Sequence, residues 1–179
     1  ITAWSIPFSY GLATYGLSNY VTSPTKTQTV ATINTSVSAN ESTAAWLIRW
    51  NGVNSMQFLS EVLQKKIKVR FAEQSFTAGS KEYDRGTLII TRAGNTSTGT
   101  SLHNLVDAAA KKANITYEAV SSTFVDKGFD FGSDRVHMIQ APKIALLAGE
   151  GVSSLGMGEI WHFFDAVINY PVNVVWMDE

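Results

Sequence analysis

The stretch between Pro142 and Met177 constrains the fold more strongly than any other part of this chain. It opens with an apolar run at 144–148 (IALLA) that lies between Pro142 and Gly149. A short apolar run bounded by proline and glycine is typical of a strand that is buried on both faces. Strands of this kind belong mostly to parallel sheets, so the run indicates an α/β protein.

A helix and a second strand follow the glycine-bearing turn. Apolar residues recur at steps of three and four, which predicts one face of a helix: Met157, Ile160, Trp161, Phe164, Val167 and Ile168. Tyr170 ends that helix because Pro171 follows it, and a residue before proline disfavours the helical conformation. The run 172–175 (VNVV) then begins a strand. This order of elements predicts a parallel β-α-β unit with a right-handed crossover.

The preceding part of the chain repeats the same pattern of elements. Residues 44–50 (AAWLIRW) predict a strand, 53–67 an amphipathic helix and 68–73 a returning strand. Between 76 and 91, two turns and a β-branched run predict a hairpin followed by a strand.

The middle of the chain adds one further helix and two strands. Residues 102–113 predict a helix, 115–120 a short strand and 136–140 a weaker one. The segment 121–135 (SSTFVDKGFDFGSDR) between the two strands is acidic and contains glycine, so we expect a loop.

Strands that alternate with helices predict a three-layer α/β fold of the flavodoxin-like type, with a mainly parallel sheet. We expect an aromatic N-terminal segment with a Ser/Thr-rich linker over 1–43 and the α/β domain over 44–179. The domain divides into two candidate halves at 44–135 and 136–179.

Composition excludes some classes of partner and of chemistry. The net charge of −1 gives no electrostatic reason to expect a nucleic-acid partner. No apolar run reaches the roughly 20 residues that a membrane span needs. The chain has no cysteine, which removes disulfides and thiolate chemistry. Because the sequence begins at Ile1 rather than at methionine, we expect a piece of a longer or processed polypeptide.

The turn after the first apolar run is one candidate ligand site. Gly149, Glu150 and Gly151 precede a helix, so backbone amides there could hold an anion. The spacing fits neither a dinucleotide fingerprint nor a phosphate loop, and the simpler interpretation is a tight turn. Ser153 and Ser154 could supply a nucleophile, but no G-x-S-x-G elbow surrounds them, and a helix cap explains one of them.

The 121–135 loop is the second candidate site. Asp126 and Asp130, with Asp134 nearby, could bind a cation or a substrate, although their spacing lacks the calcium-loop pattern. The simpler interpretation is a loop braced by its own ion pairs. The chain has no HExxH or HxxE spacing among its three histidines, so we expect no metal site here.

Five segments carry a resemblance to a known family: AWSIPFSYGL (3–12), AAWLIRWN (44–51), IKVRFAEQSFTAGSKEYDRGTLIITR (67–92), FVDKGFDFGSD (124–134) and PKIALLAGEGVSSLGMGEIWHFFD (142–165). They resemble a region downstream of the catalytic domain in large bacterial zinc carboxypeptidase-like proteins of the carboxypeptidase A-like metallopeptidase family. The last part is similar to the opening strand–helix–strand of a class I glutamine amidotransferase-like fold.

The resemblance implies a secreted or envelope location and a zinc ion in the catalytic domain of the parent protein. Neither the zinc ligands of that family nor an amidotransferase cysteine maps onto this chain. We therefore expect a non-catalytic accessory domain whose partner is the carboxypeptidase-like domain of the same polypeptide. One alternative is a peptide- or glycan-binding module that uses the 149–156 turn and the 121–135 loop together. A second is a hydrolase that uses Ser153 or Ser154.

Overall fold

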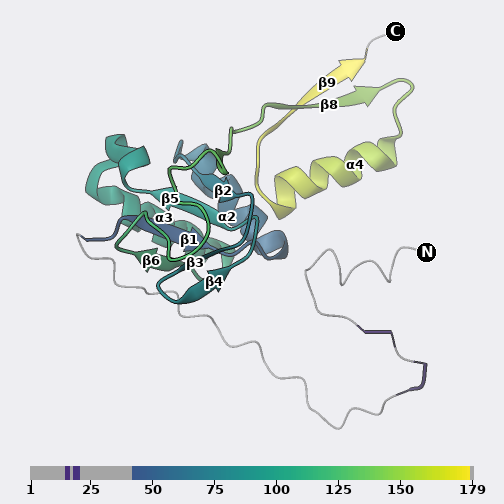
Figure 1. The fold of residues 1–179 in the computed structure, drawn as a ribbon. Coiled ribbons are helices and arrows are strands. Elements are labelled where there is room, and N and C mark those ends of the chain that lie inside the picture. Colours follow the sequence, from purple (N-terminus) through teal and green to yellow (C-terminus); the bar gives the residue numbers. More distant parts are fainter. Residues whose placement is uncertain (1–14, 17, 21–41, 178–179) are drawn as a thin grey trace.

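The computed structural model describes residues 15, 16, 18–20 and 42–177 (Figure 1). The expected aromatic segment and linker at 1–43 therefore lie almost wholly outside the described residues.

The main sheet has five strands in the order β6-β1-β5-β2-β7, and every neighbouring pair is antiparallel. Its strands are β1 (Ala45–Ile48), β2 (Arg70–Ala72), β5 (Leu88–Thr91), β6 (Glu118–Val120) and β7 (Val136–Met138). The prediction of a mainly parallel, flavodoxin-like sheet is therefore wrong.

The sequence analysis expected the two strands of each β-α-β unit to be neighbours, but another strand separates them. Strands β1 and β2 flank helix α2 (Gly52–Gln64) and run in the same direction, but β5 lies between them. Strands β5 and β6 flank helix α3 (Leu102–Ala113) in the same way, with β1 between them. Two interlocked split β-α-β units of this kind make the ferredoxin-like topology. Periodicity along the sequence reveals each helix and strand but not the strand that pairs between them.

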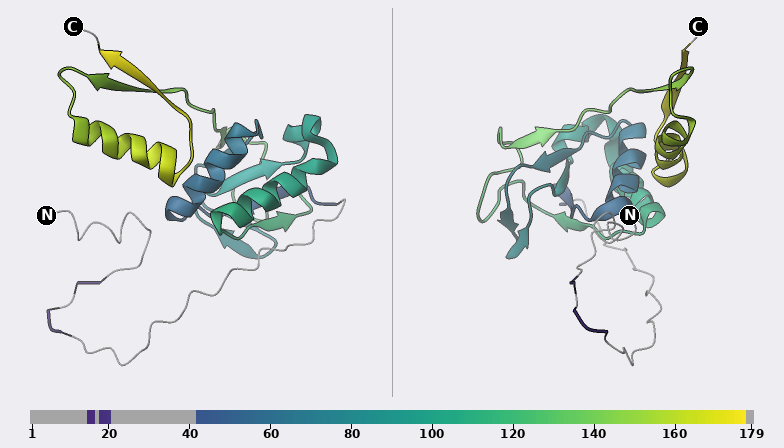
Figure 2. Two further views of the ribbon diagram at one scale, coloured as in Figure 1. Left: turned by 180° about the vertical axis from the view of Figure 1, so that it is seen from behind. Right: turned by 90° about the vertical axis from the view of Figure 1, so that its right-hand side faces the viewer.

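The two helices cover one face of the main sheet, and a hairpin and loop cover the other (Figure 2). Successive side chains of β1 point to opposite faces of the sheet. Trp46 and Ile48 pack with the helices, while Ala45 and Leu47 pack on the face that the hairpin covers. The hairpin consists of β3 (Phe76–Ala78) and β4 (Lys81–Tyr83), as predicted.

A 3-10 helix, η2 (Ala93–Ser101), leads into α3. Its buried Asn95 accepts a hydrogen bond from the backbone N–H of Lys68 at 2.7 Å and donates to the carbonyls of Lys68 and Thr91. The side chain therefore fixes the segment between β5 and α3 to the start of β2.

The β-α-β unit at the C-terminal end was predicted correctly. It consists of β8 (Ile144–Gly149), α4 (Ser154–His162), a π-helical turn η3 (Phe163–Val167) and β9 (Val172–Met177). Strands β8 and β9 are parallel, and they form a two-stranded sheet of their own that projects from the body of the molecule (Figure 1). Because β7 pairs with β2 and the N–H of Ile139 donates to the Val69 carbonyl at 2.9 Å, the division between the body and the unit falls after Ile139.

Among the described residues, no helix combines the length and apolarity that a membrane crossing requires.

Candidate functional site

The 149–156 turn lies at the tip of the β-α-β unit. Gly149 and Gly151 have φ values of +106° and +76°, which glycine adopts without strain. A Cβ on Gly149 would lie 2.8 Å from the carbonyl oxygen of Met177, so β9 passes too closely for a side chain. Ser153 Oγ accepts a hydrogen bond from the backbone N–H of Gly156 at 3.3 Å and caps α4. Glu150 and Ser154 are exposed. The two glycines and Ser153 therefore have structural roles in this turn.

The histidines do not complete a hydrolytic site around these serines. His162 lies at the other end of α4, about 12 Å from Ser154 along the helix axis at 1.5 Å per residue. His103 stacks on Trp46 in the body, and His137 Nε2 lies 3.1 Å from a carboxylate oxygen of Glu73. Over the described part of the chain, no histidine hydrogen-bonds to either serine, and no three His, Asp or Glu side chains cluster as metal ligands would.

The 121–135 loop packs on the hairpin side of the main sheet, away from the 149–156 turn (Figures 1 and 2). Asp126 Oδ2 accepts a hydrogen bond from the backbone N–H of Ser80 at 3.2 Å, and Asp130 Oδ1 accepts from that of Val125 at 2.9 Å. These carboxylates brace the loop through backbone amides rather than through ion pairs within the loop. Over the described residues, the main hollows that the 121–135 loop lines include no residue of the 149–156 turn, so these hollows do not bring the two candidate sites together.

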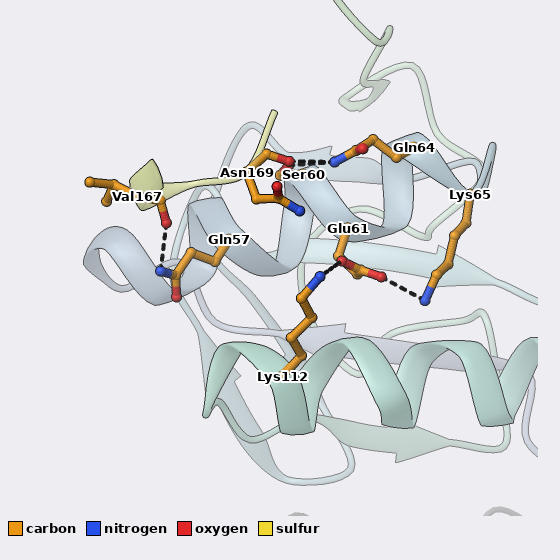
Figure 3. Close-up of polar contacts among 8 residues, drawn as sticks. All are labelled: Gln57, Ser60, Glu61, Gln64, Lys65, Lys112, Val167 and Asn169. Carbon is orange, nitrogen blue, oxygen red and sulfur yellow. Dashed lines mark hydrogen bonds and ion pairs between the residues drawn. The ribbon is translucent and has the colours of Figure 1, made fainter. Parts of the chain in front are cut away.

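The joint between α2 and the β-α-β unit was not predicted. Gln57, Ser60 and Gln64 lie on one face of α2 and donate to backbone carbonyls at the end of η3 and just after it (Figure 3). Gln57 Nε2 lies 2.7 Å from the oxygen of Val167, and Gln64 Nε2 lies 2.6 Å from that of Asn169. Because carbonyls at the end of a helix lack intrahelical partners, these side chains satisfy them.

An ion-pair network continues this joint toward α3 (Figure 3). The carboxylate of Glu61 lies 2.6 Å from Lys112 Nζ and 2.8 Å from Lys65 Nζ. Hydrogen bonds from Lys112 and then Lys65 hold the pKa of Glu61 below its ordinary value, against a smaller opposing effect of burial.

An apolar hollow of about 370 Å³, the joint hollow, lies where α2 meets the β-α-β unit. Tyr170 lines it, and its hydroxyl donates to the carbonyl of Pro142 at 2.7 Å. The other lining side chains are mostly apolar and include Met56, Leu59, Phe163 and Phe164.

The face of the β8–β9 sheet that points away from α4, the outer face, is exposed and uncharged. The register places Ala145, Leu147, Asn173, Val175 and Met177 on it. All five are exposed, and none is charged; Leu147 is 51% exposed and Val175 44%. Elsewhere in the unit, Leu155, Trp161 and Trp176 are also exposed. Parallel sheets are almost always covered on both faces, so this unit lacks a covering layer within the described residues.

Comparison of the chain with protein-family models, curated proteins and solved structures gave no match. The class that the fold and surfaces define is an α/β protein with a ferredoxin-like body and an appended parallel β-α-β unit. Its most distinctive feature is the outer face, which no described residue covers.

Proposed function

We propose that this chain is a non-catalytic accessory domain of a secreted, bacterial zinc carboxypeptidase-like protein, and that its outer face docks on the catalytic domain of the same polypeptide. The link to that family rests on the sequence resemblance. The docking role rests on one observation, an uncharged face of a parallel sheet that the described part of the chain leaves exposed.

The size of the outer face favours a covalently linked partner. Two strands of six residues present a face of roughly 20 Å by 10 Å, from a rise of about 3.3 Å per residue and a strand spacing of about 4.8 Å. Separate molecules usually need about 800 Å² of buried surface per partner for stable association. A tethered partner has an effective concentration in the millimolar range, which makes a small apolar contact sufficient.

The lack of charged residues on the outer face also favours a protein domain as its partner. The outer face has no Lys, Arg, Asp or Glu, so it offers no steering field for a charged ligand or for nucleic acid. It fits another uncharged protein surface, such as a helix or strand that would complete an α/β layer.

The accessory role predicts that the purified chain binds no stoichiometric zinc and does not hydrolyse a carboxypeptidase substrate such as hippuryl-phenylalanine. Metal content by elemental analysis and release of phenylalanine would measure both. One equivalent of zinc together with turnover would overturn the proposal.

A further inference from the structure

The loop at 121–135 presents Phe124 to water although its backbone is firmly held. Phe124 is 76% exposed. On either side of it, Phe131 N–H donates to the carbonyl of Thr123 at 3.1 Å and Asp126 N–H donates to that of Thr77 at 2.8 Å. Exposed phenyl surface forgoes about 25 cal/mol for each Å² left unburied. A ring held outward by an anchored loop is therefore a candidate contact for a ligand.

Phe124 borders two surface hollows. Phe124 lines both of them, one of about 530 Å³ and the other of about 480 Å³. Each hollow contains two hydroxyl side chains and one aspartate: Thr123, Ser133 and Asp130 in the first, and Ser121, Ser122 and Asp126 in the second. The same set of polar residue types thus lines both hollows that Phe124 borders.

Both aspartates are oriented with one oxygen left for a ligand. Asp126 Oδ2 and Asp130 Oδ1 accept from the backbone amides of Ser80 and Val125. Within the described part of the chain, the second oxygen of each carboxylate has no hydrogen-bond partner. A carboxylate oxygen accepts hydrogen bonds only, so each hollow offers an acceptor suited to a hydroxyl donor.

We propose that this surface, the Phe124 site, binds a neutral oligosaccharide. One sugar ring stacks on Phe124 through its C–H face, and the adjoining units lie in the two hollows with their hydroxyl groups bonded to Asp126 and Asp130. Among the described residues, no Lys or Arg lines either hollow, so the linings favour a neutral glycan over an anionic one. The site does not involve the outer face and is independent of the docking proposal.

Isothermal titration of the chain with cellopentaose and chitopentaose, each compared with its monosaccharide, tests this proposal. At least one pentasaccharide should bind ten or more times more tightly than its monosaccharide, because only a chain spans both hollows. Phe124→Ala should weaken that binding at least tenfold, and Phe124→Trp should retain it. Asp126→Asn and Asp130→Asn should each weaken it several-fold.

Leu155→Ala is the matched control, because Leu155 is 81% exposed and lies on the β-α-β unit. This variant should bind like the wild type. Failure of both pentasaccharides to bind at 10 mM would overturn the proposal, as would equal binding by Phe124→Ala. Tighter binding of polygalacturonate or of an unstructured peptide at this site would overturn it as well.

Discussion

Ser60 Oγ donates a hydrogen bond of 2.9 Å to the carbonyl oxygen of Asn169, which lies 109 residues further along the chain. This contact joins the ferredoxin-like body to the β-α-β unit. Asn169 has a φ of +51°, a left-handed conformation that asparagine tolerates better than most residues. The bent backbone directs the carbonyl toward α2, where Gln64 also reaches it.

Replacing Ser60 by alanine should weaken this joint. The variant loses two hydrogen bonds, the one that Ser60 Oγ donates to Asn169 and the one that it accepts from Gln64 Nε2 at 3.0 Å, while Gln64 still satisfies the Asn169 carbonyl. We therefore expect a cost of about 1–2 kcal/mol in the free energy of unfolding. Urea denaturation measures it. Ser154→Ala, at an exposed position of α4 remote from the joint, should change stability by less than half as much. Equal stability of Ser60→Ala and the wild type would show that the contact is not formed in solution.

The close approach of Gly149 to Met177 gives a second prediction. Gly149→Ala places a Cβ 2.8 Å from the Met177 carbonyl at a φ of +106°, so it should destabilise the β8–β9 pair by about 1–3 kcal/mol. Faster hydrogen exchange of the amides in β8 and β9, with unchanged exchange in the main sheet, measures this local effect.

Gly158→Ala is the matched control for that substitution. Gly158 lies within α4, and an added Cβ would meet no atom within 4 Å. Because alanine is the better helix former, this variant should stabilise α4 by about 0.5–1 kcal/mol. If the two glycine variants changed the exchange of β8 and β9 in the same direction, the parallel register described here would be contradicted.

The network around Glu61 predicts a loss of stability in acid. Its pKa is lowered in the folded chain by hydrogen bonds from Lys112 and Lys65, so the carboxylate stabilises the fold above the ordinary value of 4.5. That contribution is lost as the pH falls through the lowered pKa. Because both lysines are partly exposed to solvent, we expect it to be below about 1 kcal/mol.

Glu61→Gln isolates this contribution. The free energy of unfolding of the variant should fall less than that of the wild type between pH 7 and pH 3, as measured by urea denaturation at both values. Other ion-paired carboxylates, such as Asp107 and Glu118, account for the pH dependence of stability that remains in the variant. Identical pH profiles for the two proteins would show that Glu61 does not contribute to the loss of stability in acid.

Local patterns predicted the elements well and their pairing poorly. The apolar run at 144–148 and the helical spacing from Met157 gave a parallel β-α-β unit that the structure confirms. The two split β-α-β units were mistaken for a parallel sheet. Strand β5 lies between β1 and β2, and this pairing joins strands that are far apart in the sequence, so local patterns do not show it. A continuous apolar run also predicts burial on both faces, whereas Leu147 and Val175 are exposed.

In the candidate sites, too, local features were predicted and long-range contacts were not. Asp126 and Asp130 were proposed as ligand groups from residue type alone, and a cap was predicted at one of Ser153 and Ser154, which the structure places at Ser153. Phe124 was missed because the sequence does not distinguish an exposed phenylalanine from a buried one such as Phe131. The Ser60 contact was missed because its partner lies 109 residues away.

The central claim is that the outer face is an uncovered docking surface, and fluorescence of the apolar dye bis-ANS tests it most directly. The purified chain should bind the dye, and the double variant Leu147→Lys, Val175→Lys should lose more than half of the bound signal while circular dichroism stays unchanged. Retained dye binding in the variant, or no binding by the wild type, would show that this face is covered in solution and would contradict the account.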